Sequence, residues 1–373
     1  MKQLLLTCTD LMAIQFLVPH VKHLSANGFS VELACSDVGG RMDDLHRALD
    51  GVAQIHTVRL ARSPFSPGNA AGFGDLKKII DGAHWDIIWT NEPVMGVMTR
   101  LAARDARRHG TKVVYMVHGF HFYNGAPKKN WLLYYPVEKA CSRLCDMIVT
   151  INEEDYRRAQ TFHAARVEKI PGVGVNLERF APDENTRRAW REKLGLSADD
   201  VMLLTVGELT PRKNQHVLLT ALYLLRDSRL RLFLCGRGEL EQQLREQVEQ
   251  LQLGDWVQFL GYRKDISELC CAADLFVFSS LQEGLPKALM EAMATGLPVV
   301  CSDIRGNVDL IADGKGGFVV PNEPTRMVEA IRKLAEDPAL RAAMGAYNMQ
   351  AVDAFREEKS LEAVERLLKV IIS

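Results

Sequence analysis

Short apolar runs alternate with amphipathic segments along almost the whole chain, in two successive series. We expect strands at residues 3–8, 30–35, 55–58, 87–90, 112–116 and 147–150, and again at 202–206, 231–235, 257–260, 275–278 and 298–301. Helical patterns fall between them, at residues 13–25, 94–108, 216–225, 239–251, 266–272 and 286–295. Buried strands that alternate with helices form parallel sheets covered by helices on both faces. The sequence therefore predicts an α/β protein.

The two series are separated by residues 171–194, which begin with Pro171, Gly172 and Gly174 and continue into a charged run. Such a composition is typical of a linker. A chain of 373 residues is also too long for one ordinary core. Two doubly wound domains fit this pattern better than a closed barrel, which would need eight regular units. We place the domains at residues 1–175 and 176–355, with ligands expected at the carboxyl ends of the strands.

Bulk composition excludes several classes of protein. A net charge of −1 argues against a general nucleic-acid binder. Eight scattered cysteines without a CxxC pair are typical of buried free thiols in a reducing compartment. The chain contains no uninterrupted run of 18 apolar residues, so the sequence predicts no membrane span. The apolar run 4–18 is interrupted by Asp10 and lacks a small-residue cleavage site, so we interpret it as strand, loop and helix rather than a signal peptide.

Two carboxylates, Glu283 and Glu291, lie eight residues apart around the start of a predicted helix. Pro286 suits the first helical turn, because proline lacks the N–H that would have no partner there. The free amides that would point into a pocket are those of Gly284, Leu285 and Lys287. Such amides favour an anion, so this pattern suits a ligand with a central phosphate and hydroxyl groups at its ends, a nucleotide sugar. The competing interpretation is a helix cap plus one surface glutamate.

Paired cations follow the first strand of the second series. Arg212 and Lys213 lie on a strand-to-helix loop that begins at Gly207, where they could grip a diphosphate. A second strand-end loop begins with Gly236 and Arg237 and gains meaning only beside the first. The competing interpretation of both loops is a solvated turn.

A histidine stands at the end of the strand predicted at 112–116. His118 precedes a glycine at the expected ligand-binding edge and could bond a substrate hydroxyl or relay a proton. His121 competes for this role, but the position favours His118. A purely structural histidine is the alternative.

Cations and amphipathic aromatics mix in residues 127–136. Lys128, Lys129, Trp131 and Tyr134 would suit contact with anionic lipid. An ordinary helix with a buried aromatic face explains the pattern equally well. No Asp-x-Asp or zinc spacing predicts a metal, and the absence of a strand-linked GxGxxG disfavours a dinucleotide-dependent oxidoreductase.

Taken together, these motifs resemble the family 4 retaining glycosyltransferases. The motifs that carry the resemblance are Gly207 with Arg212 and Lys213, Gly236 with Gly238, Glu283 with Glu291, and residues 296–300. The family implies the GT-B architecture, two Rossmann-like doubly wound domains facing across a cleft. Residues 118–156 resemble the bacterial branch that builds capsule, exopolysaccharide and O-antigen.

The resemblance implies roles for individual residues. Arg212 and Lys213 would hold the donor diphosphate, and Glu291 would bind the ribose hydroxyls. Glu283 would face the donor sugar, and His118 would contact the same sugar. Backbone groups from Gly284 through Leu285 and Pro286 to Lys287 would bind sugar hydroxyls or phosphate, and the loop from Gly236 and Arg237 would lie near the base.

One loop departs from the family pattern. Many relatives carry paired glycines after the first strand, whereas residues 7–12 of this chain contain none. Thr9 and Asp10 are candidates to border the acceptor instead. The family also implies that the C-terminal helix, within residues 356–373, crosses back onto the first domain.

The implied activity is retaining transfer of a hexose or N-acetylhexosamine from a nucleotide sugar, with UDP as the expected nucleotide. The implied acceptor is a polyprenyl-diphosphate-linked saccharide at the cytoplasmic face of the membrane, with no cofactor or metal. Front-face substitution and double displacement through Glu283 both stay open. So do two other classes, a nucleotide-sugar 2-epimerase and a non-catalytic subunit of a polysaccharide assembly complex.

Overall fold

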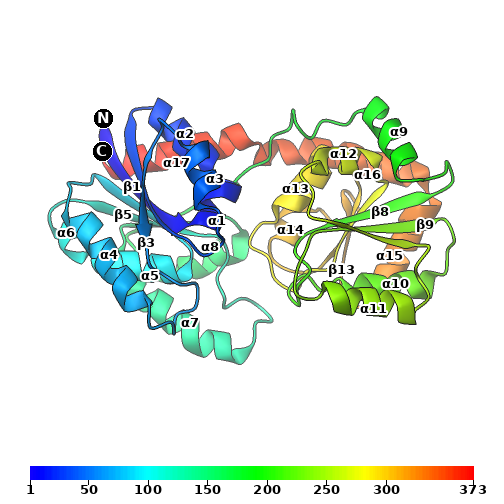
Figure 1. Ribbon diagram of the computed structural model, residues 1–373, viewed down its shortest axis with the longest axis horizontal. Helices are drawn as coiled ribbons and strands as arrows, with labels where there is room; N and C mark the ends of the chain where they lie inside the picture. Colours follow the sequence, from blue (N-terminus) through cyan, green and yellow to red (C-terminus); the bar gives the residue numbers. More distant parts are fainter. The chain divides into compact units, whose positions relative to one another are not determined.

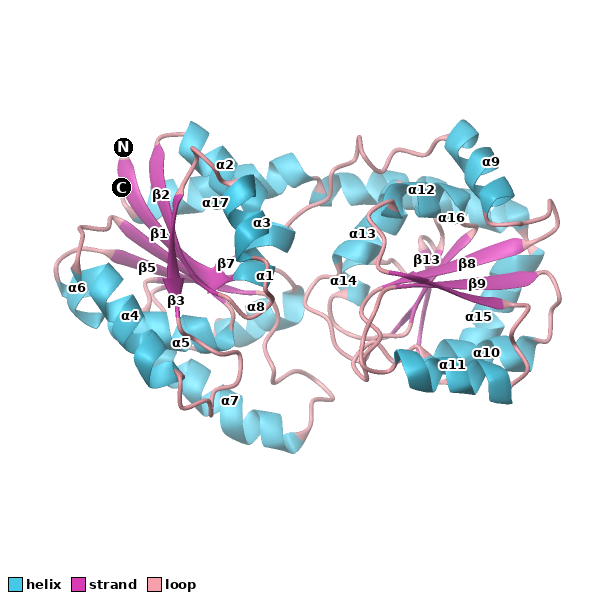
Figure 2. Cartoon of the chain, viewed as in Figure 1, coloured by secondary structure: helices cyan, strands magenta, loops and turns pink.

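The computed structural model describes residues 1–373 and divides into two compact units (Figure 1). The N-terminal unit comprises Met1–Val173 and Glu358–Ser373, and the C-terminal unit comprises Gly174–Glu357. Each unit contains its own wholly parallel sheet with helices on both faces, as Figure 2 shows. The prediction of two Rossmann-like α/β domains is confirmed.

The sheet of the N-terminal unit has the order β3-β2-β1-β4-β5-β6-β7. Its strands are β1 (Lys2–Thr9), β2 (Phe29–Ser36), β3 (Gln54–Val58), β4 (Ile87–Asn91), β5 (Lys112–Val117), β6 (Met147–Thr150) and β7 (Arg166–Lys169). Strand β1 pairs with β2 on one side and β4 on the other, so the strand order reverses between β1 and β4. The sequence pattern missed β7, because this short edge strand is partly charged and none of its residues is buried.

The helices of this unit are α1 (Asp10–Met12), the π-helical turn η1 (Ala13–Leu17), α2 (Val18–Ala26), α3 (Met42–Ala48), α4 (Asn69–Asp81), α5 (Pro93–Ala102), α6 (Arg104–Arg108), α7 (Lys128–Cys141), the 3-10 turn η2 (Ser142–Leu144) and α8 (Glu153–Ala159). The prediction of a loop at residues 7–12 is wrong. Residues 7–9 complete β1 and helix begins at Asp10, because the Thr9 hydroxyl accepts from the Met12 N–H and caps the turn.

The last helix, α17 (Glu357–Ile371), belongs mainly to the N-terminal unit. His23 Nε2 of α2 lies 2.6 Å from Glu365 Oε2, and the buried Ser360 hydroxyl donates to the Gly172 carbonyl. On the sheet's other face, α4, α5 and α7 bury their apolar sides in one core with the strands (Figure 1). The chain leaves and re-enters this unit at neighbouring points, since Val175 bridges Arg356.

The sheet of the C-terminal unit has the order β10-β9-β8-β11-β12-β13. Its strands are β8 (Val201–Val206), β9 (Leu230–Cys235), β10 (Val257–Gly261), β11 (Leu275–Phe278), β12 (Val299–Ser302) and β13 (Gly317–Val320). Its helices are α9 (Glu184–Lys193), α10 (His216–Leu225), α11 (Glu241–Gln250), α12 (Ile266–Ala272), α13 (Lys287–Ala294), α14 (Asn307–Leu310), α15 (Pro324–Glu336) and α16 (Pro338–Ala351), followed by the 3-10 turn η3 (Val352–Phe355). Strand β13 was not predicted, because it begins in a glycine-rich turn and its residues after Gly317 are only half-buried, unlike the fully buried strands of the same length.

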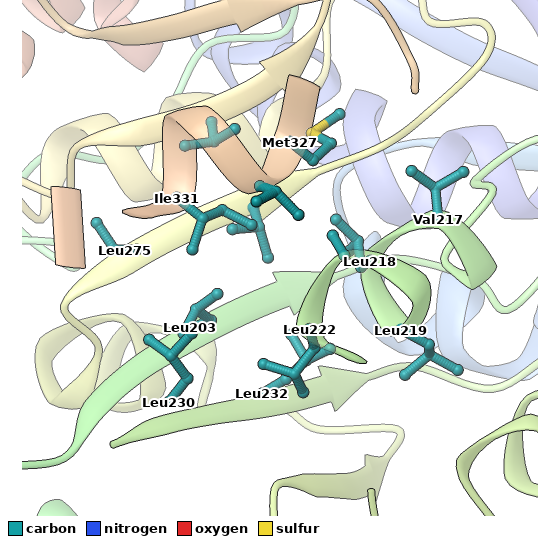
Figure 3. Close-up of a cluster of buried hydrophobic side chains, with 14 of the residues drawn as sticks. Leu203, Val217, Leu218, Leu219, Leu222, Leu230, Leu232, Leu275, Met327 and Ile331 are labelled. Atoms are coloured by element: carbon teal, nitrogen blue, oxygen red, sulfur yellow. The ribbon is translucent and has the colours of Figure 1, made fainter. Parts of the chain in front are cut away.

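Leucine-rich packing fixes one face of this second sheet. Figure 3 shows Leu218 and Leu222 of α10 and Met327 and Ile331 of α15 above the strands. All four side chains are buried, and Leu203 of β8 belongs to the same cluster. This packing anchors the strands whose carboxyl ends carry the candidate donor loops.

The region predicted as a linker contains α9, which packs against α12. Arg187 and Arg191 both bind Asp274, at 2.5 and 2.9 Å, and donate to carbonyls at the end of α12. Residues 171–194, predicted to be a linker, contain the boundary between the two units at residues 173 and 174, but their charged run folds into α9 and forms ion pairs with the C-terminal unit.

Candidate active site

Three strand-end loops of the C-terminal unit are hydrogen-bonded to one another. The Leu209 N–H donates to the Arg237 carbonyl at 2.9 Å, and the Gly236 N–H donates to the Gly261 carbonyl at 2.8 Å. A Cβ on Gly236, whose φ is 152°, would lie 1.9 Å from the Gly207 carbonyl oxygen. Only glycine at position 236 therefore lets the loop after β9 approach the loop after β8 this closely. The next residue, Arg237, is exposed.

A cluster of three charged side chains joins the β8 loop to the β11 loop. Arg212 Nη1 and Lys213 Nζ both donate to Oε1 of Glu283, at 3.0 and 2.7 Å. The Arg212 carbonyl also accepts from the Leu281 N–H at 2.8 Å, so backbone and side chains hold the two loops together. The sequence predicted these three residues separately, and the structure brings them into direct contact.

Burial and pairing oppose each other in this charged cluster. Burial alone would raise the pKa of Glu283, but Lys213 and Arg212 outweigh it and hold that pKa below its usual value. Burial lowers the pKa of Lys213, against the attraction of Glu283. Arg212 also lies 3.9 Å from Oε2 of the exposed Glu208, and its own side chain stays 41% exposed, so its guanidinium remains accessible. The cluster can therefore receive an anion.

The segment after Glu283 forms the start of α13. The helix begins at Lys287, and Pro286 is its N-cap with extended backbone (φ −73°, ψ 117°). Placing Pro286 in the first helical turn was therefore wrong by one residue. The Glu283 carbonyl accepts from Arg305 Nε at 3.0 Å, which fixes the entry to the loop of Gly284 and the buried Leu285.

Glu291 lies on α13, one turn after Lys287. It is half-buried, and its carboxylate forms no hydrogen bond within the protein. Burial raises the pKa of Glu291 to about 7, against the weaker opposing effects of Lys287 and Arg179. A carboxylate with unused acceptor sites can bind the two hydroxyls of a ribose.

In the N-terminal unit, His118 follows β5 and lies beside the end of β4. Its Nε2 is 3.0 Å from Oδ1 of Asn91. Burial lowers the pKa of His118 to about 4, so the ring is neutral near pH 7. Because Nε2–H donates to Asn91, Nδ1 carries the free lone pair and can accept from a substrate hydroxyl. His121 instead packs against Tyr134, with ring centroids 4.6 Å apart.

Further neutral groups are linked to Asn91, whose Nδ2 donates to the Thr7 carbonyl at 3.4 Å. The Thr7 hydroxyl bonds those of Thr90 and Thr99 at 2.6 and 2.9 Å across β1, β4 and α5. Burial lowers the pKa of His20 to about 3, with a smaller contribution from His118, and its Nδ1 is buried without a partner. Asn91, His118 and the three threonines are thus joined by hydrogen bonds between uncharged groups.

The two residues predicted to border the acceptor have different environments. Asp10 is fully buried, and its carboxylate accepts the backbone N–H groups of Val38, Gly39 and Arg41 at 2.8 to 3.1 Å. These bonds commit the Asp10 carboxylate to holding the β2–α3 loop, and its place beside the acceptor stays a prediction. Thr9 lies at the strand end and donates both its N–H and its hydroxyl to Glu92.

The aromatic residues of α7 face inward. Trp131 packs on the core, with the Arg158 guanidinium 4.5 Å from its ring centroid, and Tyr134 is half-buried. Neither therefore lies on the outer surface as the lipid-contact interpretation required. The exposed residues of this helix include Lys128, Lys129, Leu132, Leu133 and Val137.

Sequence reasoning missed a pocket at the end of β10. Its lining residues are Tyr262, Arg263, Lys264, Asp265 and Glu268. The signal available in the sequence was Tyr262 directly after Gly261, and the structure shows that this tyrosine is exposed. It also missed Asn91 and Glu92, which stand at the end of a strand without any glycine or charge run to mark them.

No group of three or more His, Cys, Asp or Glu side chains is arranged to hold a metal ion. No helix combines the length and the hydrophobicity that crossing a bilayer requires.

Comparison with known proteins connects these features to a family. Residues 17–179 match the model of Glycosyltransferase Family 4, and residues 186–351 match that of Glycosyl transferases group 1. EpsD of Bacillus subtilis (strain 168), named as a glycosyltransferase, is 40% identical over 353 residues, covering 93% of this chain and 91% of that protein. A UDP-Gal:alpha-D-GlcNAc-diphosphoundecaprenol alpha-1,3-galactosyltransferase of Escherichia coli is 28% identical, covering 91% of this chain and 88% of that protein.

Solved structures show the same fold. Anabaena HepE in complex with UDP superposes with a TM-score of 0.81 at 22% identity, covering 99% of this chain and 100% of HepE. Sucrose-phosphate synthase from Thermosynechococcus elongatus gives a TM-score of 0.76 at 20% identity, covering 100% and 99%. The chain belongs to the family 4 glycosyltransferases and has their GT-B fold.

Proposed function

We propose that this glycosyltransferase moves a hexose or N-acetylhexosamine from a UDP-sugar to a polyprenyl-diphosphate-linked saccharide in bacterial surface-polysaccharide synthesis. The name of the Escherichia coli relative includes a UDP-linked donor and a diphosphoundecaprenol acceptor. Solved complexes of Anabaena HepE contain UDP and UDP-glucose. Both support the choice of donor and acceptor class.

The contact of Arg212 and Lys213 with Glu283 carries the proposal. The two cations would hold the donor diphosphate and stabilise the charge that develops on it as the nucleotide leaves. Glu291, with its unbonded carboxylate, would receive the ribose hydroxyls, and Arg237 and Gly236 would border the base. Backbone groups of Gly284 and its neighbours would bind the sugar.

We favour front-face substitution with retention over double displacement. In front-face substitution the bond between the anomeric carbon and the phosphate oxygen breaks, and its electron pair stays on the phosphate. The acceptor oxygen then bonds to the anomeric carbon on the same face, and its proton passes to the leaving phosphate. Glu283 is a poor nucleophile, because two cations occupy its Oε1 and lower its pKa.

Three further properties belong to the proposal. Neutral His118 would accept a hydrogen bond from the donor sugar through Nδ1. Charge stabilisation by Arg212 and Lys213 would make the reaction independent of a metal, so EDTA should leave turnover unchanged. On α7, Lys128, Lys129, Leu132, Leu133 and Val137 would contact the cytoplasmic face of the membrane, where basic and apolar side chains bind anionic lipid.

The alternatives are less favoured. An epimerase of this architecture needs acid and base groups around the sugar ring, whereas Glu283 is committed to two cations. A non-catalytic subunit has no need to maintain a buried charged cluster. Epimerised donor in the absence of acceptor would support the first alternative, and no turnover with any acceptor would support the second.

A combined binding and transfer assay tests the proposal. Thermal unfolding is measured with UDP-, GDP-, ADP- and dTDP-sugars, where a ligand at 100 times its Kd stabilises by about 2.7 kcal/mol. The stabilising sugar is then offered with a short-chain prenyl-diphosphate-linked N-acetylhexosamine, and NMR of the product gives the anomeric configuration. Inversion, or stabilisation by no UDP-sugar, would contradict the proposal.

A further inference from the structure

Glu92, directly after β4, has a backbone conformation that glycine normally occupies. Its φ is 66° and its ψ is 155°. This region is essentially restricted to glycine. The following residue, Pro93, further restricts Glu92 to extended conformations with negative φ. A side chain kept in such a conformation has a reason beyond local folding, and strained backbone of this kind concentrates at functional sites.

The strained backbone directs the Glu92 carboxylate across the point where the strand order reverses. Oε2 accepts the Thr9 N–H at 2.7 Å and Oε1 accepts the Thr9 hydroxyl at 3.0 Å. Thr9 ends β1, and Glu92 follows β4, the neighbouring strand. A carboxylate has about four acceptor positions, so about two stay open. Doubly wound sheets bind their ligands at this reversal point.

The open acceptor positions have no charged partner in contact. Burial raises the pKa of Glu92, and the bonds from Thr9 and the nearby charge of Arg62 only partly oppose it. Arg62 is itself exposed and forms no ion pair. The residue before Glu92 is Asn91, which holds His118. Consecutive residues of one strand end therefore position the two polar groups of this edge.

A purely structural role explains less of this geometry. Capping one N–H and one hydroxyl of Thr9 needs only an acceptor at this place, not a glutamate in a glycine conformation. The conformation instead brings the carboxylate to the carboxyl edge of the sheet, where a hydroxyl can reach it.

We propose that Glu92 binds a hydroxyl of the acceptor saccharide and thereby selects and orients it. This inference rests on the proposed function and adds the residue that recognises the acceptor. Glu92 is assigned no part in donor binding, which belongs to the loops of the C-terminal unit together with His118. A carboxylate held in this way accepts a hydrogen bond from a hydroxyl, and an acceptor that lacks this hydroxyl leaves the carboxylate unsatisfied.

The test is a cycle between protein variants and acceptor analogues. Wild type, Glu92→Gln and Glu92→Gly are assayed with a prenyl-diphosphate-linked N-acetylhexosamine and its single-position deoxy analogues. Losing a hydrogen bond to a charged group should lower kcat/KM for the acceptor by about 10–100-fold. One deoxy analogue should show a similar loss with wild type and little additional loss with Glu92→Gly.

Readouts beyond transfer separate recognition from folding. UDP-sugar affinity and the slow hydrolysis of donor without acceptor should be unchanged in both variants. The unfolding midpoint of Glu92→Gly should not fall, because relief of the backbone offsets the lost bonds to Thr9. Glu32→Gln is the matched control, since Glu32 is a carboxylate of the same unit that binds His56 of the edge strand β3, away from the strand ends.

Three outcomes would overturn the inference. If both Glu92 variants keep acceptor kcat/KM within about threefold of wild type, Glu92 does not recognise the acceptor. If donor affinity falls as much as transfer does, Glu92 acts on the donor or on folding. If wild type binds UDP-sugars but transfers to no lipid-linked saccharide, the proposed acceptor class is wrong and this inference falls with it.

Discussion

The two units organise their strand ends with different chemistry. The C-terminal unit places full charges in contact, with Arg212 and Lys213 on Glu283. The N-terminal unit pairs His118 with Asn91 and three threonine hydroxyls with one another, and its strand-end carboxylates Asp10 and Glu92 accept from uncharged donors rather than from cations. Charge suits a leaving diphosphate, whereas directional neutral bonds suit sugar hydroxyls. This difference fits the proposed roles, in which the C-terminal unit holds the donor diphosphate and the N-terminal unit binds sugar hydroxyls.

The largest effect is expected when the charged cluster loses a cation. Arg212→Ala or Lys213→Ala should lower turnover by about 10²–10³, the usual effect of removing one preorganised charge-stabilising group. Steady-state kinetics with saturating acceptor measures the loss. Arg229→Ala, an exposed arginine of the same unit paired with Asp227, should stay near wild type. A loss below tenfold in both cluster variants would remove their assigned role.

A smaller effect is expected for the pH dependence of UDP-sugar binding, which Glu291 should determine. Glu291 has a pKa of about 7 because of burial, so it ionises as the pH rises through neutrality. If its ionised form binds ribose, UDP-sugar affinity should rise about tenfold between about pH 6 and about pH 8. UDP-sugar is the probe, because its diphosphate diester does not titrate in this range.

Calorimetry with Glu291→Gln supplies the control for that pH dependence. The variant should bind with an affinity near that of the protonated wild type, at every pH. An unchanged slope in the variant would assign the titration to another group.

In the neutral unit, the sharpest single change is Asn91→Ala. It removes the acceptor that fixes the His118 tautomer, and loss of one neutral hydrogen bond should lower kcat by about fivefold. Asn91→Asp is the informative companion. A carboxylate at this position should raise the pKa of His118 and create a pH dependence of turnover that wild type lacks, visible in a pH–rate profile.

The smallest effect is a pair of opposite pH dependences of stability. The pKa values of His20 and His118 are lowered, to about 3 and about 4, so the unfolded chain binds more protons below its own histidine pKa. Their contribution to stability is therefore complete above about pH 6.5 and lost as the pH falls toward about 4. Glu291, with a raised pKa, acts in the opposite sense, and its contribution is lost as the pH rises through about 7.

Denaturant unfolding followed across this pH range measures both slopes. Phe substituted for His20 should flatten the acid limb, and Glu291→Gln should flatten the limb between about pH 4.5 and about pH 7. Identical curves for His20→Phe and wild type would show that His20 does not titrate on unfolding as its burial requires.

Prediction from sequence succeeded where one local pattern determines the structure. Each predicted strand lies within two residues of an observed one, because buried parallel strands are continuous apolar runs. Arg212, Lys213 and Glu283 could be singled out because cations and carboxylates beside glycines are rare at strand ends. Their roles stay predictions, although their mutual contact is a fact of the structure.

Prediction from sequence failed where contacts between distant parts of the chain determine the structure. Asp10 looked like an open strand-end carboxylate, but backbone N–H groups about thirty residues later in the sequence occupy it. Trp131 and Tyr134 were predicted to anchor the chain at a lipid surface, but in the fold both rings pack partly against the core. Glu92 gave no signal at all, because its backbone conformation depends on how β1 and β4 come together. No window of the sequence contains that information.

The return of residues 358–373 to the N-terminal unit has a consequence for biosynthesis. About 180 residues are translated between the two parts of this unit, which takes about 10–40 s at typical bacterial rates. During that interval the surface that later binds α17, including His23, is exposed to solvent, while the C-terminal unit can already fold. The first unit to emerge from the ribosome is thus the last to be completed.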